Sequence, residues 1–291
     1  MKLDHIGLAT KDFEKTSQAF LNLGFSLLHR EPSIHAPKNM RINQVFLNDF
    51  VIEIMGVADP HKPSFIDEAL ESTTQTVTLH HFCWLVDDIS ATFDRLLKTG
   101  HYTVHEDITG TVLTPGNKIG FLKHENLRWI EFIERVTPRT LPAVNPKPEI
   151  WMGHIGYVTK DLDAASEAFL ELGLEPMYES YKHHIPRNML INREKVSNLE
   201  LEIMTVADSS KPSFLDETLQ TMAAAPSGLE HINYRTDDIY QTVYNLITFH
   251  GFRTRNPIQT SYLYPPNKGT VLSNDYTGLV EISYLATEIS R

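Results

Sequence analysis

The sequence of 291 residues predicts an α+β protein built from four modules, each of the order β-α-β-β-β. Two observations predict this organisation: a repeat that relates the two halves of the chain, and a weaker repeat inside each half. Two modules of four strands would form one curved eight-stranded sheet, with the helices outside and a cleft inside. We therefore expect two domains, residues 1–136 and 151–291, joined by a linker of residues 137–150.

The repeat between the halves extends over the whole chain. LDHIGLAT at residues 3–10 matches MGHIGYVT at 152–159, and EIMGVADPHKPSF at 53–65 matches EIMTVADSSKPSF at 202–214. The residue numbers of matched positions differ by a constant offset. The offset is 149 up to Glu53 and Glu202, and it is 150 in the second part of each half. A register this constant indicates a tandem duplication.

Each module begins with the same pattern of a strand and a helix. LHHFCWLVDD at residues 79–88 and LEHINYRTDD at 229–238 open the second modules as LDHIGLATKD opens the first. An alternating apolar run is typical of a strand, and the aspartates that follow fit helix N-caps. Gly24, Gly100 and Gly251 fit the residue that ends a helix. Runs of β-branched and aromatic residues then predict the remaining strands.

The segment between the halves, TPRTLPAVNPKPEI, contains four prolines. Proline fixes φ and cannot donate a hydrogen bond to a β-ladder, so this segment is expected to be a semi-rigid, extended linker.

Composition limits the setting and the partners. The net charge of −11 disfavours a nucleic-acid partner, because a negative field repels phosphates. The sequence contains neither an apolar run long enough for a membrane span nor a signal peptide. Cys83 is the single cysteine, so a disulfide within the chain is impossible and a reduced, cytoplasmic location is expected. We expect a small-molecule substrate and no membrane partner, and the sequence leaves a homodimer open.

Strand alternation places one histidine and one glutamate of each module on the cleft side. Bulky apolar residues of the same strands, such as Ile6 and Leu8 for the first strand, share the opposite face and should pack against the helices. The eight residues are His5, Glu53, His81, Glu131, His154, Glu202, His231 and Glu281.

This set of side chains predicts metal binding. Carboxylates on the inner face of a sheet are costly unless a cation compensates them. Two neutral imidazoles and two carboxylates form a neutral site with a divalent ion and leave coordination positions open. We therefore predict a divalent metal, Zn, Ni, Co, Mn or Fe, in one or both halves. A single histidine of this kind would more often be a hydrogen-bonded core residue, and the fourfold recurrence is what favours ligands.

The motif D-H-I-G-(L/Y)-x-T-K-D, the closing glutamate of each module and the paired modules resemble the vicinal-oxygen-chelate (VOC) superfamily. Its members include glyoxalase I, methylmalonyl-CoA epimerase, extradiol ring-cleaving dioxygenases and fosfomycin-resistance proteins. The resemblance implies that the eight residues above are metal ligands. It also implies that the metal binds two neighbouring substrate oxygens and stabilises the enolate or oxyanion that forms.

Four ligands in each site favour a non-redox lyase or isomerase acting on a small oxygen-chelating substrate. Glu131 and Glu281 are the candidate general bases, with pure metal ligation as the alternative role. An iron(II)-dependent extradiol dioxygenase and a non-catalytic protein that sequesters a small molecule are the alternative functions. Each site could use one half of the chain, or the modules could exchange between halves.

Five further residues are weaker candidates for the cleft. Arg235 shares a strand face with His231, so it could bind an anionic substrate group or form a structural salt bridge. Asn39 and Asn188 could contact substrate or form Asx turns. His35 and His184 precede them, and we expect surface loops there rather than the mouth of the cleft.

Overall fold

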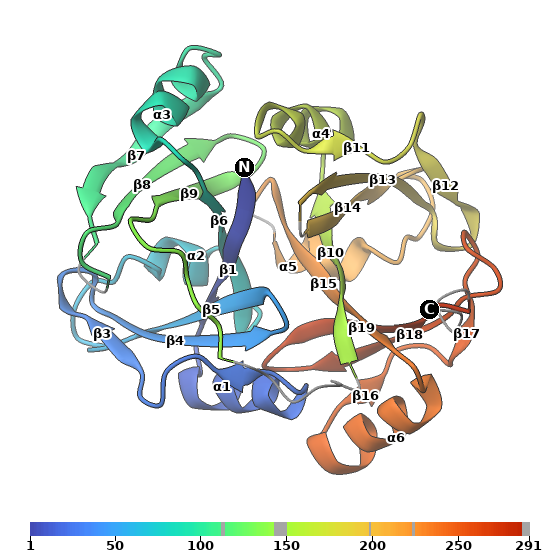
Figure 1. Ribbon diagram of the computed structural model, residues 1–291. Helices are drawn as coiled ribbons and strands as arrows, with labels where there is room; N and C mark the ends of the chain where they lie inside the picture. Colours follow the sequence, from blue (N-terminus) through green and yellow to red (C-terminus); the bar gives the residue numbers. More distant parts are fainter. Residues whose placement is uncertain (112–113, 143–149, 198, 223–224, 287–291) are drawn as a thin grey trace.

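The computed structural model describes residues 1–111, 114–142, 150–197, 199–222 and 225–286. It contains two mixed β-sheets, one in each half of the chain, which lie side by side (Figure 1). Half of the predicted linker, residues 143–149, lies outside the described residues, and its last residue, Ile150, begins a strand.

Within its described residues, the first half contains nine strands and three α-helices. The strands are β1 (Lys2–Thr10), β2 (Ser26–Leu27), β3 (Ser33–His35), β4 (Met40–Leu47), β5 (Phe50–Val57), β6 (Val77–Leu85), β7 (Tyr102–Gly110), β8 (Lys118–His124) and β9 (Arg128–Glu134). The helices are α1 (Phe13–Asn22), α2 (Asp67–Glu71) and α3 (Ile89–Leu97), with a 3₁₀ turn η1 (Ala36–Lys38).

The second half repeats this order. Its strands are β10 (Ile150–Thr159), β11 (Glu175–Pro176), β12 (Lys182–His184), β13 (Met189–Val196), β14 (Leu199–Val206), β15 (Ser227–Thr236), β16 (Arg253–Thr254), β17 (Gln259–Thr260), β18 (Lys268–Asn274) and β19 (Gly278–Tyr284). Its helices are α4 (Leu162–Glu171), α5 (Asp216–Thr221) and α6 (Ile239–His250), with a 3₁₀ turn η2 (Ile185–Arg187).

The main path of each sheet has the eight strands that the modules predict. The orders are β2-β4-β5-β1-β6-β9-β8-β7 and β11-β13-β14-β10-β15-β19-β18-β16, and the short strands β3, β12 and β17 lie off these paths. Strand β1 pairs in parallel with β5 and antiparallel with β6, and β6 pairs in parallel with β9. All strands of a sheet come from the same half, so the modules pair within a half and do not exchange.

Local signals set the helices where the sequence predicts them. The side chains of Asp12, Asp88, Asp161 and Asp238 each accept a hydrogen bond from the backbone N–H three residues on. Gly251 ends α6 in the left-handed region at φ 72°, which glycine adopts without strain.

The helix-facing sides of the two sheets share one hydrophobic core. Phe25 contacts Tyr234 with ring centroids 5.9 Å apart, and Phe82 contacts Tyr157 at 5.8 Å, so the contacts cross between the halves. Figure 1 shows β1 and β6 beside β10 and β15 at this junction. Leu3 also joins this core, although alternation predicts it on the cleft face, because the register of β1 shifts between Leu3 and His5.

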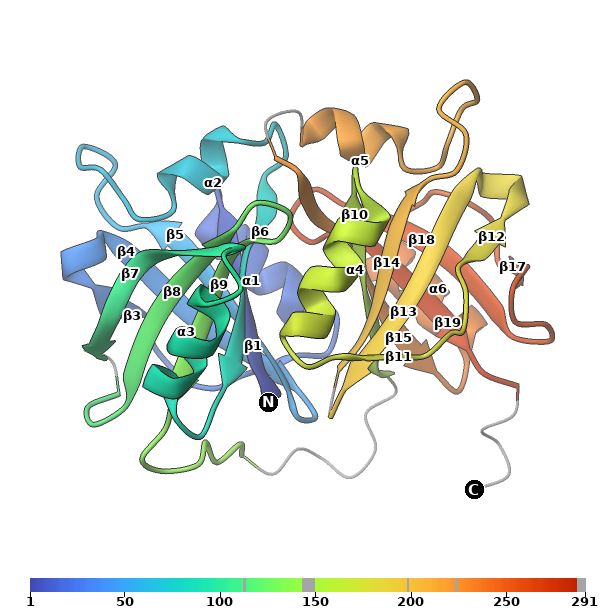
Figure 2. The ribbon, with the colours of Figure 1, turned by 90° about the horizontal axis from the view of Figure 1, so that it is seen from above.

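The segment VAD-x-x-KPSF, present in both halves, forms a loop that leads into a short helix, and we call it the KPSF loop. Phe65 and Ile66 pack with Met40, Ile42 and neighbouring apolar residues in a second, smaller cluster. Figure 2 shows α2 and α5, which follow these loops, on the same side of the molecule. Among the described helices, none has both the length and the apolar content needed to cross a membrane.

Candidate metal centres

In the first half, four predicted ligands converge from β1, β5, β6 and β9. The Nε2 atoms of His5 and His81 lie 3.2 Å apart, and Oε2 of Glu131 lies 3.2 Å from the first and 3.0 Å from the second. Glu53 joins them, since donor atoms of His5, Glu53 and His81 all lie within 4.8 Å of one another. Sheet register explains the convergence, because Gly7 on β1 pairs with both Glu53 and His81.

In the second half, the matching residues form a similar group. The Nε2 atoms of His154 and His231 lie 3.0 Å apart. Oε2 of Glu281 lies 3.5 Å from each of them, and Oε2 of Glu202 lies 3.6 Å from the first and 3.9 Å from the second.

These separations fit donors that share one ion. Ligand atoms about 2.1 Å from a metal are about 3.0 Å apart at neighbouring octahedral positions and about 3.4 Å apart at tetrahedral ones. Histidine nitrogen and carboxylate oxygen are also the donors that Zn, Ni, Co, Mn and Fe accept. The residues present therefore fit a divalent ion in each half, in agreement with the donor set that the sequence predicts.

A glycine makes room for one imidazole in each site. A Cβ atom built on Gly7 would lie 2.1 Å from the ring of His81, and one built on Gly156 would lie 2.3 Å from the ring of His231. Any side chain would displace these rings. This role was not predicted from the sequence, although a signal was present: each glycine lies two residues after a predicted ligand histidine, on the same face of its strand.

Carboxylates orient a different histidine in each half. In the first site Nδ1 of His5 lies 2.9 Å from Asp4, and in the second Nδ1 of His231 contacts Glu230. Such contacts direct the Nε2 lone pair toward a metal and increase the basicity of the ring. The contact of His81 is instead with Nδ1 of His80, at 2.8 Å.

Burial and close contacts shift the pKa values of the clustered groups. Burial lowers the pKa of His5, but hydrogen bonds to Asp4 and Glu131 outweigh it and raise this pKa to about 9. Burial likewise lowers the pKa of His231, and Glu230 with the cleft glutamates raises it to about 9. Burial raises the pKa of Glu131, and hydrogen bonds to the two histidines bring it well below its usual range. The clusters thus hold protons that a divalent ion would displace.

The first glutamate of each site has a different partner. Gln44 donates a hydrogen bond of 2.8 Å to Oε2 of Glu53. At the matching position, Arg193 donates from Nε and Nη2 to Oε1 of Glu202, at 3.0 and 2.7 Å. Burial raises the pKa of Glu202, but the charge of Arg193 contributes most to holding it well below its usual range.

Each cluster opens into a cavity in its own half. The first cavity, of about 450 Å³, is lined by His5, Glu53 and Glu131, and the second, of about 650 Å³, by His154, Glu202 and Glu281. His35 lines the first cavity and His184 the second. The expectation of plain surface loops at these two histidines is therefore wrong, because the 3₁₀ turn that follows each of them folds against the cavity wall.

The asparagines predicted as substrate contacts form hydrogen bonds to the KPSF loops instead. Nδ2 of Asn39 donates to the carbonyl oxygens of Asp59 and Lys62, and its Oδ1 accepts from the N–H of Asp59. Asn188 makes the matching bonds in the second half. Because these bonds use both ends of each amide, the substrate contact is corrected to a role in the turn.

Arg235 lines the second cavity and also contacts Glu200, with 3.2 Å between Nη2 and Oε2. The predicted salt bridge is therefore present. The two candidate bases also differ in exposure: the side chain of Glu131 is 9% exposed and lies between two imidazoles, whereas that of Glu281 is 23% exposed. Glu131 is the poorer candidate for a base, since its carboxylate is more buried and lies closer to both imidazoles.

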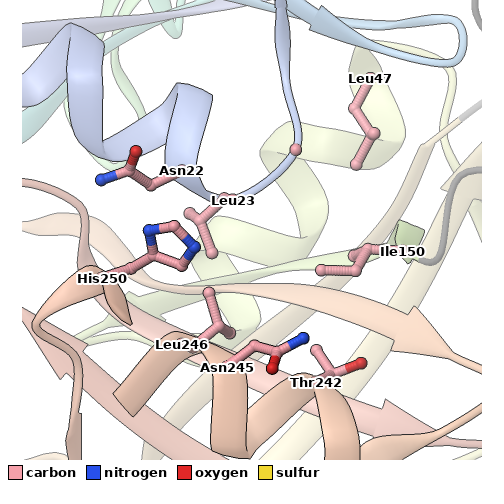
Figure 3. Close-up of a pocket in the computed structure, with 9 residues that line it drawn as sticks. Asn22, Leu23, Leu47, Ile150, Thr242, Asn245, Leu246 and His250 are labelled. Atoms are coloured by element: carbon pink, nitrogen blue, oxygen red, sulfur yellow. The ribbon is translucent and has the colours of Figure 1, made fainter. Parts of the chain in front are cut away.

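Another cavity, of about 250 Å³, lies where α1 ends near α6 and the start of β10 (Figure 3). Its wall contains Leu23, Ile150 and Leu246, with His250 as its single imidazole and no carboxylate. It lacks the donor set of the two clusters and belongs to the junction between the halves.

Comparisons with known proteins agree with the fold. The family model described as "Glyoxalase/Bleomycin resistance protein/Dioxygenase superfamily" matches residues 4–121 and 153–259. No curated protein matches the sequence.

Several solved enzymes have a similar fold. A triple mutant of 4-hydroxymandelate synthase from Streptomyces coelicolor has a TM-score of 0.74 and 13% identity, covering 97% of this chain and 92% of that one. The Mn(II)-bound glyoxalase from Novosphingobium aromaticivorans has a TM-score of 0.62 and 11% identity, covering 97% and 81%. Catechol 2,3-dioxygenase has a TM-score of 0.55 and 11% identity, covering 97% and 87%. At these identities the likeness concerns the fold.

The two ranges that the family model matches make up most of the chain, one range in each half. The protein therefore belongs to the glyoxalase/bleomycin resistance protein/dioxygenase superfamily, the VOC superfamily that its sequence motifs resemble.

Proposed function

We propose that each half binds one divalent metal ion and that the protein is a metal-dependent lyase or isomerase. Its substrate would be a small molecule with two neighbouring oxygens. The convergence of two histidines and two glutamates in each half supports this proposal most strongly. Four protein ligands leave two octahedral positions, enough for a chelating substrate but not for a substrate together with dioxygen.

A divalent ion in this site would supply Lewis-acid stabilisation of negative charge on the substrate oxygens. The protein's own groups would position the substrate and move the proton. Glu281 is the candidate base of the second half, because it lines the cavity and is partly exposed. Asn233 donates a hydrogen bond of 2.8 Å to Oε2 of this glutamate, the oxygen that faces the two histidines. Its other oxygen, Oε1, is therefore left to accept a proton.

Deuterium exchange tests the proposed reaction class. The full chain would be stripped with a chelator, reloaded separately with Zn, Ni, Co, Mn or Fe(II), and incubated in D₂O with 2-oxo and 2-hydroxy acids. We expect metal-dependent deuterium incorporation next to the carbonyl carbon, detected by NMR and unchanged when oxygen is removed. Glu281→Gln should remove the exchange that depends on the second half, whereas Glu175→Gln, at an exposed glutamate, should leave it unchanged.

Two other outcomes would overturn this function. Oxygen uptake confined to the Fe(II)-loaded protein would indicate a ring-cleaving dioxygenase. Tight, metal-dependent binding without exchange or turnover would indicate a sequestering protein.

A further inference from the structure

Each cavity contains one cation from a 3₁₀ turn. This turn is η1, before β4, in the first half and η2, before β13, in the second. Lys38 lies 3.9 Å from the ring centroid of Phe65, and the guanidinium of Arg187 lies 4.4 Å from that of Phe214. Both cations line the cavities into which the metal clusters open. The KPSF loop of each half supplies the phenylalanine ring, so it positions a cation in the same place in both halves.

The two cations differ in what neutralises them. Lys38 forms an ion pair with Glu106 of β7. The position matching Glu106 in the second half is Asn256, a neutral residue whose Oδ1 already accepts from the N–H of Val271. Within the described residues, Arg187 has no acidic partner.

The other charged side chains in the wall of the second cavity also make it positive. Its wall contains Arg187, Arg193, Arg235 and Lys268, and its two glutamates are the predicted metal ligands. A divalent ion would neutralise these glutamates, and Glu200 pairs with one arginine. This excess of positive charge lies in a protein whose formal net charge is −11. A cavity that concentrates positive charge in this way favours an anionic ligand.

We propose that Arg187 binds a carboxylate of the substrate in the second cavity, so the substrate carries a carboxylate in addition to its chelating oxygens. This assignment depends on the proposed function of the site. One unpaired guanidinium can donate two parallel hydrogen bonds to one carboxylate, the geometry in which arginine is most selective. The first cavity lacks this anchor, because Glu106 occupies Lys38. The first cavity also contains Arg135 and Arg139, but both contact Asp4. Within the described residues, only the second cavity therefore presents an arginine without an acidic partner.

Matched pairs of 2-oxo acids test the anchor. Calorimetric binding to the Zn-loaded full chain would compare 2-oxoglutarate with 2-oxopentanoate, and 2-oxoadipate with 2-oxohexanoate; each pair shares its chain length and differs in a distal carboxylate. We expect the dicarboxylate of at least one pair to bind about tenfold or more tightly than its partner. Arg187→Gln should remove this difference while leaving the Kd of the monocarboxylate within about twofold.

Two variants separate the anchor from general electrostatics. Lys38→Gln changes the matching cation of the first half and should leave the preference intact. Asn256→Glu places a carboxylate in the second half at the position that Glu106 has in the first half. It should neutralise Arg187 and abolish the preference, although Arg187 remains. Unchanged thermal midpoints would show that the variants are folded.

The outcomes distinguish the anchor from the chelating function. Equal affinities within both pairs, or a preference that survives Arg187→Gln, would overturn the anchor. If the monocarboxylates still bind only to metal-loaded protein, the chelating function stands alone. If no acid binds, or if removing the metal has no effect on binding, both proposals fail.

Discussion

The two candidate metal centres have the same four ligand types but differ in the charges around them. In the first half neutral Gln44 contacts the glutamate from β5, whereas in the second half Arg193 forms a buried ion pair with the glutamate from β14. The cation near the cavity mouth is neutralised by Glu106 in the first half, and the matching Arg187 has no such partner within the described residues. The second centre is therefore more positive.

This difference suggests a division of roles after duplication. A positive charge beside the ligands opposes a divalent ion and attracts an anionic substrate. We therefore expect the first half to hold its metal more tightly and the second half to bind an anion more tightly.

The largest expected effect comes from the glycines that make room for the imidazoles. Gly7→Ala should lower the metal affinity of the first half by about 100-fold, because the new Cβ displaces the ring of His81. Gly156→Ala should do the same in the second half only. Metal titration of the chelator-treated protein measures both.

Gly110→Ala is the matched control, since a Cβ there meets no atom within 4 Å. If Gly7→Ala binds two ions with unchanged affinity, the ring of His81 does not need this space and the site described here is wrong.

A buried carboxylate distinguishes the cores of the two halves. Glu194 is fully buried where the first half has Val45, and burial raises its pKa from 4.5 to about 7. The folded state thus favours the protonated form, and its stability falls as the pH rises from about 4.5 to about 7. A shift of this size corresponds to about 3 kcal/mol.

Urea unfolding of the wild type and of Glu194→Gln between pH 5 and pH 8 tests this difference. The wild type should lose up to about 3 kcal/mol relative to the variant over this range. Parallel stability curves for the two proteins would show that Glu194 does not titrate there.

The smallest expected effect comes from exchanging the partners of the ligand glutamates. Arg193→Gln should raise the metal affinity of the second half by about tenfold, because it removes a positive charge beside the site. Gln44→Arg should lower that of the first half by about the same factor. Competition with a coloured chelator measures both, and shifts in the opposite directions would contradict the electrostatic comparison.

The repeat and the strand alternation were sufficient to predict the fold and the side chains that converge in each half. The repeat fixed the four modules, and period-two patterns placed His5 and Glu131 on one face. Contacts between strands were harder to foresee. The space above Gly7 becomes visible only when β1 and β6 are in register.

Features that depend on tertiary packing were also missed or misplaced. The shift that turns Leu3 into the core has no sequence signal of its own. The role of Arg187 depends on a neutral residue at the position that matches Glu106, and that residue, Asn256, is distant from Arg187 in sequence. Asn39 fits its turn chemistry, and the substrate contact considered for it failed because a loop twenty residues away uses its amide.

The central claim is that each half of the chain holds one divalent ion. Elemental analysis of the metal-loaded wild type, His81→Ala and His231→Ala tests it most directly. We predict two equivalents of metal per chain in the wild type and one in each variant, with none left in the double variant. A metal content that is negligible in the wild type, or equal in all four proteins, would contradict the claim.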